Sequence, residues 1–574
     1  MPAEKHIHRS LMIFGLLLAA SYLHPLHIHP FRTYYHDALS LLGLLLAFAF
    51  LAIPKKPQLN LPGILWVPMA IASLIAAQLL SGLIVHRWEV LIPIAYLLLA
   101  ALAMVYGASV AATPGGDQKI CLTLAVGFLL AGLLSVAMQN IQFLGLDLSP
   151  AVMFMSHQAN AVFRPYANVA QPNQLALLLC MALASVWWLY RQARLPAWVA
   201  GGLALFLIWG LSLTQSRIGW IIAPAFVLMV WPRAGQQRPV SRMLLLGLLL
   251  AYIGCVLAIP ALAALVGVDA SSVTEHVGGR SERMVLMQQA LHMSLQHPWF
   301  GIGWFGFGSE QVRIAADFTP TTYAEHAHNL VLNFAAELGW PATLAISAVL
   351  LAWFFSIYRR AGGSTSMRFA SLIFFAALVH SMVEFPLWYA FVLIPVAVLM
   401  GMVHQMHWHT APAPAARGGI VAVVIASICG MALMTLDYQR VQDGFNALRL
   451  QKEGYSFDKK ALEQPAFTVF PYFFDYFKLM AVQPHEGMSV QEIAFVEDAS
   501  RRFGFVHSLN TMAEVYVLNG QPDKALRTMI TLQRLHPFSY NPYYDYWKAK
   551  GAIDPSRYGK VFRQMPAREA EQGG

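Results

Sequence analysis

Charged residues are scarce in this sequence. They make up 12% of its 574 residues, while hydrophobic residues make up 57%. A soluble globular domain carries about twice that share of charge. Many apolar runs approach the roughly 20 residues that a helix needs to cross a bilayer. The composition therefore excludes a soluble globular protein and predicts an all-α protein that crosses a membrane many times.

Cysteine is equally scarce. The four cysteines each lie inside an apolar run, which predicts small buried side chains: Cys121, Cys180, Cys255 and Cys429. No CxxC or Cys/His spacing indicates a metal site. The net charge of +9 is spread over short loops, and no basic run is interleaved with aromatics. The sequence therefore gives no indication of a nucleic-acid-binding face.

The apolar runs predict about 12 or 13 transmembrane helices. Their approximate ranges are 10–24, 37–54, 62–85, 90–112, 119–141, 174–190, 196–213, 218–232, 243–266, 341–358, 369–384, 389–406 and 418–436. The N-terminal MPAEKHIHRS and the apolar run after it lack a small-x-small cleavage site, so we expect a retained first helix rather than a signal peptide.

Basic residues distinguish the two sides of the membrane. With the N-terminus inside, the cytoplasmic loops hold Lys55, Lys56, Lys119, Arg191, Arg194, Arg233, Arg238, Arg242, Arg359, Arg360, Arg368 and Arg417. The short external loops hold only Arg32, Arg87, Arg164 and Arg217. This asymmetry favours the chosen orientation. The helix 329–338 is too short to cross and is expected to be external or re-entrant. The loops 142–173, 216–217, 267–328 and 384–389 then share the external face, which predicts a single active site there.

The segment YAEHAHNLVLNFAAELGWP (323–341) concentrates polar residues beside an apolar helix. Such a cluster in a membrane protein is a site hypothesis by default. Asn329 is a good helix N-cap, and His328 can accept or donate a proton near neutral pH. The alternative is a capped helix with a structural histidine. A metal site at His326 and His328 is disfavoured, because no third ligand is evident.

Two further external segments suit a sugar and a phosphate. Gln171 and Asn173 in FRPYANVAQPNQLALLL offer amides, which suit hydroxyl-rich ligands; the alternative is a polar helix cap. Arg217 in LTQSRIGW suits a phosphate because its planar fork donates two hydrogen bonds; the alternative is an interfacial arginine.

The last two segments follow the same logic. Arg280 and Arg283 in GGRSERM stand before an amphipathic helix and would complete a diphosphate clamp with Arg217; the alternative is an ordinary interfacial helix. Tyr389 in HSMVEFPLWYAFVL flanks a turn that contains proline; the alternative is an interfacial aromatic belt.

The residues from about 437 onward differ in composition. They are charged and lack an apolar run of spanning length, and AEVYVLNGQPDKALRTMITLQRLHP (513–537) is similar to one tetratricopeptide-like helical hairpin. We expect a small external helical domain, which either docks an acceptor or partner or packs as a lid without a specific ligand.

The order and spacing of these motifs resemble the O-antigen ligase/polymerase superfamily of bacterial inner-membrane glycosyltransferases. RPYANVAQPNQLA and HSMVEFPLWYAF are similar to its protein-modifying branch, the PglL/PilO-type O-oligosaccharyltransferases. The resemblance implies three parts: N-terminal transmembrane helices (1–145), a catalytic membrane region that includes a periplasmic loop at 267–340 (146–436), and a periplasmic C-terminal helical domain (437–574).

The resemblance also implies an activity. A glycan would move en bloc from undecaprenyl pyrophosphate to a Ser or Thr hydroxyl of a periplasmic protein such as a pilin, at the periplasmic face of the inner membrane. His328 would be catalytic, and Arg217 with Arg283 or its rival Arg280 would bind the diphosphate. The glycan or acceptor would meet Gln171, Asn173, Tyr389, Asn329 and Glu325. No cofactor is implied, and a metal is not needed if arginines neutralise the diphosphate; the external loops contain no DxD.

Rival functions stay open at this point. The same chemistry with a lipid A–core acceptor would make an O-antigen ligase, and with a lipid-linked glycan acceptor an O-antigen polymerase. A lipid-linked glycan transporter is disfavoured because the sequence shows no internal repeat. A non-enzymatic docking protein would not explain three arginines beside a histidine on one face.

Overall fold

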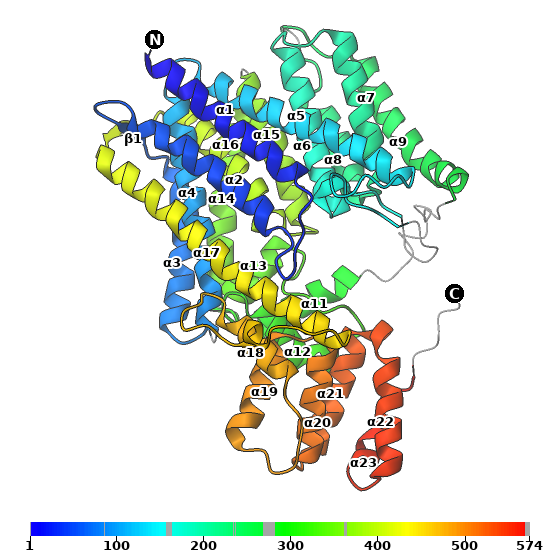
Figure 1. The fold of residues 1–574 in the computed structure, drawn as a ribbon. Coiled ribbons are helices and arrows are strands. Elements are labelled where there is room, and N and C mark those ends of the chain that lie inside the picture. Colours follow the sequence, from blue (N-terminus) through cyan, green and yellow to red (C-terminus); the bar gives the residue numbers. More distant parts are fainter. Residues whose placement is uncertain are drawn as a thin grey trace. The chain divides into compact units, whose positions relative to one another are not determined.

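Helices make up most of the fold (Figure 1). The structure is a computed structural model and describes residues 2–84, 86–156, 163–233, 235, 237–267, 282–360 and 364–568. Ten helices in these ranges are long and apolar enough to cross a membrane, and three shorter apolar helices accompany them. In hydrocarbon a helix satisfies its own backbone polar groups, which is why apolar runs fold this way. The predicted polytopic all-α fold is confirmed.

Every predicted span coincides with a helix. The helices are α1 (Pro2–Leu23), α2 (Tyr34–Ala49), α3 (Trp66–Leu80), α4 (Leu91–Ala111), α5 (Gly116–Phe143), α6 (Pro172–Arg191), α7 (Ala197–Leu213), α8 (Arg217–Met229), α9 (Arg242–Leu265), α14 (Trp340–Arg360), α15 (Thr365–Ser381), α16 (Ala390–Trp408) and α17 (Arg417–Lys452). The shorter three are α7, α8 and α15.

The remaining elements are shorter. The helices are α11 (Glu282–Gln296), α12 (Phe307–Ile314), α13 (Leu330–Leu338), α18 (Pro471–Met480), α19 (Val490–Arg502), α20 (Val506–Leu518), α21 (Pro522–Leu535), α22 (Asn541–Ile553) and α23 (Tyr558–Phe562). The 3₁₀ turns are η1 (Phe50–Ala52), η2 (Gly63–Leu65), η3 (Arg87–Val90), η4 (Ala167–Val169), η5 (Ala315–Asp317), η7 (Pro386–Trp388), η8 (Lys459–Leu462) and η9 (Pro537–Ser539). β1 (Gln58–Asn60) pairs antiparallel with β2 (Pro412–Pro414), with Leu59 opposite Ala413.

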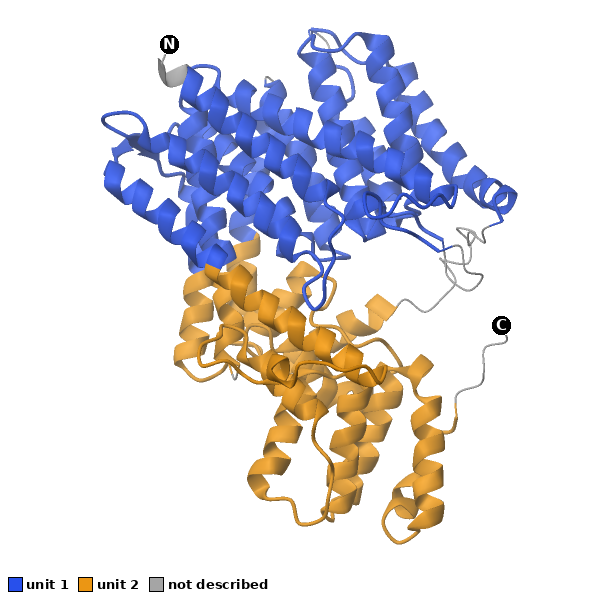
Figure 2. Cartoon of the chain, in the orientation of Figure 1, with its two compact units in different colours: residues 1–71, 95–279, 348–432 blue, residues 72–94, 280–347, 433–574 orange. Residues whose placement is uncertain are grey.

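The chain divides into two compact units (Figure 2). Unit 1 comprises residues 1–71, 95–279 and 348–432, and unit 2 comprises residues 72–94, 280–347 and 433–574. The three-part division by role, with boundaries near 145 and 436, stays a prediction.

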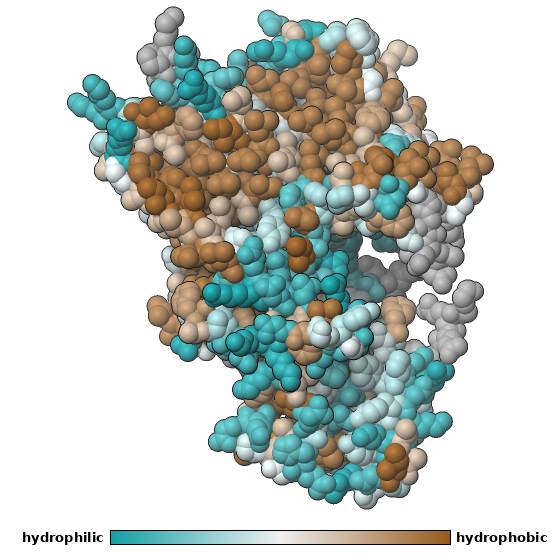
Figure 3. Space-filling model, viewed as in Figure 1, coloured by the Kyte–Doolittle hydropathy of each residue, from teal (hydrophilic) through white to brown (hydrophobic). Residues whose placement is uncertain are grey.

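Unit 1 is a bundle with α5, α6, α15 and α16 at its centre. Side chains from these helices, such as Phe128, Leu178 and Leu399, are fully buried in one core. Large apolar side chains also cover its outside: Trp66 is 68% and Trp198 80% exposed. Figure 3 shows this apolar surface in brown over the helices of unit 1. Apolar surface of this extent is what a protein immersed in lipid presents to its surroundings.

The cysteines follow this division between core and lipid-facing surface. Cys121 and Cys180 are buried as predicted, and Cys255 is half-buried. Cys429 is exposed, so the prediction of a buried side chain is wrong there. It lies on α17, and only 11% of the most apolar stretch of that helix is buried inside the protein. An apolar run in a membrane protein can face lipid instead of other helices.

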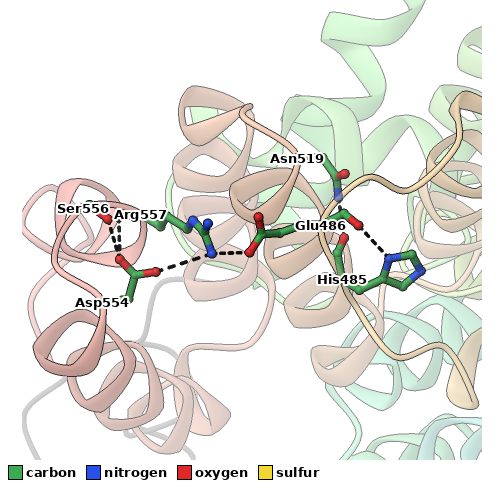
Figure 4. Close-up of polar contacts among 6 residues, drawn as sticks. All are labelled: His485, Glu486, Asn519, Asp554, Ser556 and Arg557. Carbon is green, nitrogen blue, oxygen red and sulfur yellow. Dashed lines mark hydrogen bonds and ion pairs between the residues drawn. The ribbon is translucent and has the colours of Figure 1, made fainter.

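The C-terminal helices of unit 2 form a small helical array, as predicted. α20 and α21 form the hairpin expected over 513–537, with Gly520 in the turn at φ 73°. Their apolar faces bury Leu509, Met529 and Leu532. Polar contacts join the segment before α19 to the α20–α21 turn and to the segment between α22 and α23 (Figure 4). Asn519 Nδ2 donates to the His485 carbonyl at 3.0 Å, and Arg557 pairs with Glu486. Exposed pairs of this kind contribute little energy, so the apolar core holds the array together.

Candidate functional site

The residues expected to form the site fall into both units. Gln171, Asn173, Arg217 and Tyr389 belong to unit 1. Arg283, Glu325, His328 and Asn329 belong to unit 2. Arg280 lies outside the described residues. Each set is described within its own unit.

In unit 1, Asn173 joins three segments that are far apart in the sequence. Its Oδ1 accepts hydrogen bonds from Ser216 Oγ and Arg164 Nη2, both at 2.9 Å. Its Nδ2 donates to Glu384 Oε1 at 2.7 Å. Asn173, Ser216 and Glu384 are all at least 94% buried. The amide thus uses both its acceptor and its donor, and it ties the first turn of α6 to the turns before α8 and before η7.

The hydrogen bonds around Asn173 also fix the turn before Arg217. Arg164 Nε donates to the Thr214 carbonyl at 2.8 Å, so one guanidinium binds both Asn173 and this turn. Ser216 is the N-cap residue of α8, and Arg217 is its first helical residue, with an exposed side chain. Arg217 therefore starts from a rigid, hydrogen-bonded turn.

Gln171 has a local structural role. It is the N-cap of α6, and its Oε1 accepts from the Gln174 backbone N–H at 2.6 Å. The alternative of a polar helix cap is thus realised for this residue. The cap uses the side-chain oxygen of Gln171, and the binding of glycan or acceptor by this residue stays a prediction.

Tyr389 occupies the N-cap position of α16 and lies between aromatic rings. Its ring is 5.3 Å from Phe391 and 5.6 Å from Phe385. The next backbone N–H, that of Ala390, donates to Asp37 Oδ1 at 2.6 Å. Tyr389 is half-buried, so it is held by the protein rather than standing in an open aromatic belt.

In unit 2, His328 stands at the start of α13 in a strained conformation. Its φ is 52°, in the left-handed region that non-glycine residues enter only at a cost. Asn329 is the predicted N-cap, with Oδ1 accepting from the Leu332 N–H at 3.0 Å. His326 packs edge-on against His328, with ring centroids 4.6 Å apart. In the described residues, no group of three or more potential metal ligands gathers around this pair.

Two polar residues on α13 hold the His328 loop. Asn333 Oδ1 accepts from the Ala327 N–H at 2.9 Å, and its Nδ2 donates to Glu337 Oε2 at 3.1 Å. Burial raises the pKa of Glu337 to about 8, although backbone N–H groups of Phe305 and Phe307 and the Asn333 amide act against the rise. The loop is therefore fixed by a column of polar groups one helical turn apart.

The glycines of HPWFGIGW and ELGWP let two backbones touch. A Cβ on Gly301 would lie 2.4 Å from the Glu337 carbonyl carbon, and one on Gly339 would lie 2.5 Å from the Trp299 oxygen. Both have positive φ, 67° and 83°. The Ile302 N–H donates to the Ala336 carbonyl at 2.8 Å. Two motifs that the sequence only places in order are thus packed against each other.

The other side of the His328 loop is held by Arg502 of α19. Arg502 Nη1 donates to Glu325 Oε1 at 2.6 Å, and its Nε pairs with the buried Glu89. The phenol of Tyr323 donates to the Arg502 carbonyl at 2.8 Å. Burial acts to lower the pKa of Arg502, but the two carboxylates outweigh it and raise the pKa well above its ordinary value. Glu325, expected to meet glycan or acceptor, is thus engaged by this arginine.

Arg283 lies in the first turn of α11, which begins at Glu282, rather than before the helix. Thr321 Oγ1 donates to the Glu282 carbonyl at 3.3 Å. This contact ties the start of α11 to the segment that leads to His328.

Sequence reasoning missed several residues of the two sets. Arg164 stood in the quoted FRPYANV motif but was counted only as an external arginine. Asn333 and Glu337 had a usable signal, because two polar residues four apart on a short apolar helix share one face. The sequence contains no signal for three residues whose backbone has a positive, left-handed φ. Ala170, Gln215 and His328 have φ of 60°, 47° and 52°, and each directly precedes an N-cap residue of a site segment.

Two family profiles match parts of the chain that hold some of these residues. The profile of the O-antigen ligase family matches residues 202–347. The profile described as the C-terminal region of virulence factor membrane-bound polymerases matches residues 369–543.

Two characterised relatives come from Acinetobacter baylyi. The general O-oligosaccharyltransferase is 27% identical over 558 residues, which cover 92% of this chain and 93% of the relative. The ComP-specific O-oligosaccharyltransferase is 24% identical over 403 residues, which cover 70% of this chain and 72% of the relative. Over most of its length the chain is thus similar to O-oligosaccharyltransferases, and two shorter segments match the profiles of the O-antigen ligase family and of membrane-bound polymerases.

Proposed function

We propose that this protein transfers a preassembled glycan en bloc from undecaprenyl pyrophosphate to Ser or Thr hydroxyls of periplasmic proteins such as a pilin. The observation that carries the proposal is the similarity to a general O-oligosaccharyltransferase along 92% of the chain. The match also covers 93% of that relative, so the similarity is not confined to one shared segment. The site would face the periplasm, as the distribution of basic loop residues favours.

The reaction forms a bond from the acceptor oxygen to the anomeric carbon and breaks the bond from that carbon to the diphosphate. The hydroxyl proton goes to His328, and the lipid diphosphate leaves with the electron pair of the broken bond. A base at hydrogen-bond distance makes the hydroxyl a better nucleophile. Direct displacement inverts the anomeric carbon.

The geometry around His328 supports its role as the base. Asn329, Asn333 and Arg502 restrain the loop on both sides, through the cap, the Ala327 N–H and Glu325. A base fixed in this way loses little conformational freedom when substrates bind. Left-handed strain at a non-glycine residue is typical of functional positions.

The arginines would stabilise the departing diphosphate. Negative charge grows on its oxygens as the bond breaks, so Arg217 and Arg283, with Arg280 as the rival of Arg283, stabilise the transition state more than the ground state. A guanidinium neutralises phosphate without a metal, and no cofactor is required. Gln171 and Tyr389 would orient the sugar or the acceptor. Asn173, expected to do the same, is buried with its amide already hydrogen-bonded, so it would act by holding the turns that it joins.

The test is reconstitution in a bacterial host that supplies a lipid-linked glycan and a candidate pilin. Intact mass of the pilin reports transfer. His328→Ala is expected to lower transfer about 100-fold or more, the range for loss of a general base. His326→Ala is the matched control, since its ring packs 4.6 Å away, and it should retain most of the activity.

Full glycosylation by His328→Ala at wild-type expression would overturn the catalytic assignment. A ligase function is a second candidate, because the O-antigen ligase profile matches residues 202–347. The same host should therefore be assayed for glycan on lipid A–core. Glycan there with an unmodified pilin would replace the proposed acceptor.

A further inference from the structure

Three loops at one end of unit 1 carry arginine as their only charged residue. They hold Arg191 and Arg194 (190–197), Arg233, Arg238 and Arg242 (230–243), and Arg359, Arg360 and Arg368 (358–369). None of these segments contains lysine, aspartate or glutamate. Cytoplasmic loops are enriched in basic residues generally, but that rule is satisfied by lysine equally well. Segments with arginine and no lysine suit a phosphate ligand, because the planar guanidinium can donate two hydrogen bonds to one phosphate.

An apolar cavity opens at the same end of the bundle. It has a volume of about 300 Å³ and lies among α6, α7, α8 and α9. Trp187 and Tyr190 from the last turn of α6, Ala197 from the start of α7 and Ser241 from the start of α9 line it. Its wall is almost wholly aliphatic and aromatic, so water would find few partners inside. In a bilayer, a hydrocarbon chain is the occupant that matches such a wall.

The arginines stand over the residues that line the cavity. The Arg238 Cζ lies 4.9 Å from the centre of the Tyr190 ring, and the Arg191 Cζ lies 5.9 Å from that of Trp187. Both rings belong to the cavity wall. Arg368 is 94% buried at the start of α15 and is close enough to Arg233 and Arg191 for their charges to repel. Gln192 Nε2 donates to Thr365 Oγ1 at 2.7 Å and holds the ends of α6 and α15 together.

From this juxtaposition we propose that unit 1 binds an anionic glycerophospholipid, with its acyl chain in the cavity among α6–α9 and its phosphate on the arginines at the rim. Basic pockets between transmembrane helices on the cytoplasmic side are suited to anionic head groups. A phosphate relieves the mutual repulsion of the arginines, and the chain fills apolar space. The site lies at the helix ends opposite to Asn173 and Arg217, and it does not depend on the proposed function.

Binding is tested on the full-length protein, purified and delipidated, then mixed separately with phosphatidylglycerol, phosphatidylcholine or undecaprenyl phosphate. Native mass spectrometry counts bound lipid, and thermal unfolding reports stabilisation. We expect phosphatidylglycerol to bind and stabilise, and phosphatidylcholine to do so weakly. Arg191→Gln and Arg238→Gln should each weaken phosphatidylglycerol about fivefold, the effect of one basic residue near a membrane surface.

Two adjacent glycines of α7 provide a matched pair for the cavity. A Cβ at Gly201 or Gly202 meets no atom within 4 Å, but only Gly201 lines the cavity. Gly201→Leu should fill the cavity and abolish the stabilisation by phosphatidylglycerol, while Gly202→Leu should leave it intact.

Three results would overturn the proposal: equal binding of phosphatidylglycerol and phosphatidylcholine, undiminished binding by Gly201→Leu, or retention of undecaprenyl phosphate alone. The last would make the cavity part of the donor site instead. If Gly201→Leu fails to fold, the two arginine variants decide the outcome by their affinity for phosphatidylglycerol.

Discussion

The side chain of Asn173 links three segments of the proposed site in unit 1. It accepts from Ser216 and Arg164 and donates to the buried Glu384, so each of its polar atoms is used. In a low-dielectric interior a group that loses its partner costs much more than a satisfied bond contributes. The residues that orient substrate in the proposed reaction therefore depend on this amide.

Exchanging the donor and the acceptor of the Asn173–Glu384 hydrogen bond tests how much this bond contributes. Asn173→Asp replaces the donor toward Glu384 by an oxygen, so two carboxyl groups face each other at 2.7 Å. We expect a loss of about 1–3 kcal/mol in unfolding free energy and reduced transfer. The double variant Asn173→Asp/Glu384→Gln restores one donor and one acceptor and should recover much of both. Unchanged stability of Asn173→Asp would show that the bond contributes nothing.

Glu337 gives unit 2 a pH dependence. Its pKa is raised from 4.5 to about 8 because burial disfavours the charged form. A carboxyl whose pKa is raised by folding contributes stability that is fully present below its ordinary pKa and is lost as pH rises through the raised value. Wild-type unfolding temperature should therefore fall between pH 4.5 and about 8 relative to Glu337→Gln, which stays neutral throughout. Parallel pH curves for the two proteins would contradict the prediction.

At the scale of elements, the turn 298–304 and α13 hold each other in place. Gly301 lies against the backbone of Glu337, and the side chain of Gln78 donates to the Glu337 and Phe300 carbonyls at 2.8 and 2.9 Å. His328 precedes α13, so the position of the proposed base depends on this backbone packing.

Gly301→Ala tests the packing, with Gly82→Ala as its control. Both glycines have positive φ, 67° and 77°, so alanine costs about 1 kcal/mol of backbone strain at each. Only Gly301 adds a steric clash, because a Cβ at Gly82 meets no atom within 4 Å. Gly301→Ala should therefore lower the unfolding temperature further than Gly82→Ala and should speed proteolysis in the 298–304 turn. Equal effects of the two changes would show that backbone contact is unimportant there.

Elements were predictable wherever local chemistry determines them. The apolar run 119–141 lies within the helix Gly116–Phe143, and Asn329 is an N-cap as expected. The hairpin expected over 513–537 is formed by α20 and α21. Contacts over long sequence separation were not predictable. Asn173 meets Ser216 and Glu384 across 43 and 211 residues, and Arg502 reaches Glu325 across 177. Hydropathy and capping carry no information about such pairs, which depend on how helices assemble. Left-handed φ at Ala170, Gln215 and His328 is likewise a product of assembly.

For the whole molecule, the orientation in the membrane remains a prediction from charge. Both the proposed periplasmic site and the proposed cytoplasmic lipid site require loops such as 55–56 inside and the C-terminal helices outside. Lys56 and Ser539 are exposed and suit single-cysteine labelling in a variant whose four native cysteines are replaced by alanine. Removal of Cys429 matters most, since it is the exposed one.

Labelling should differ between these two positions in intact cells with a permeabilised outer membrane. A membrane-impermeant maleimide is expected to modify Ser539→Cys at once and Lys56→Cys only after lysis. The positive-inside rule gives this outcome because short loops rich in lysine and arginine resist translocation. The reverse pattern would put His328 and the proposed acceptor site in the cytoplasm, where no pilin is presented, and would move the arginine-rimmed cavity to the outer leaflet. Both proposals would then need new substrates, even if every helix and contact described here is correct.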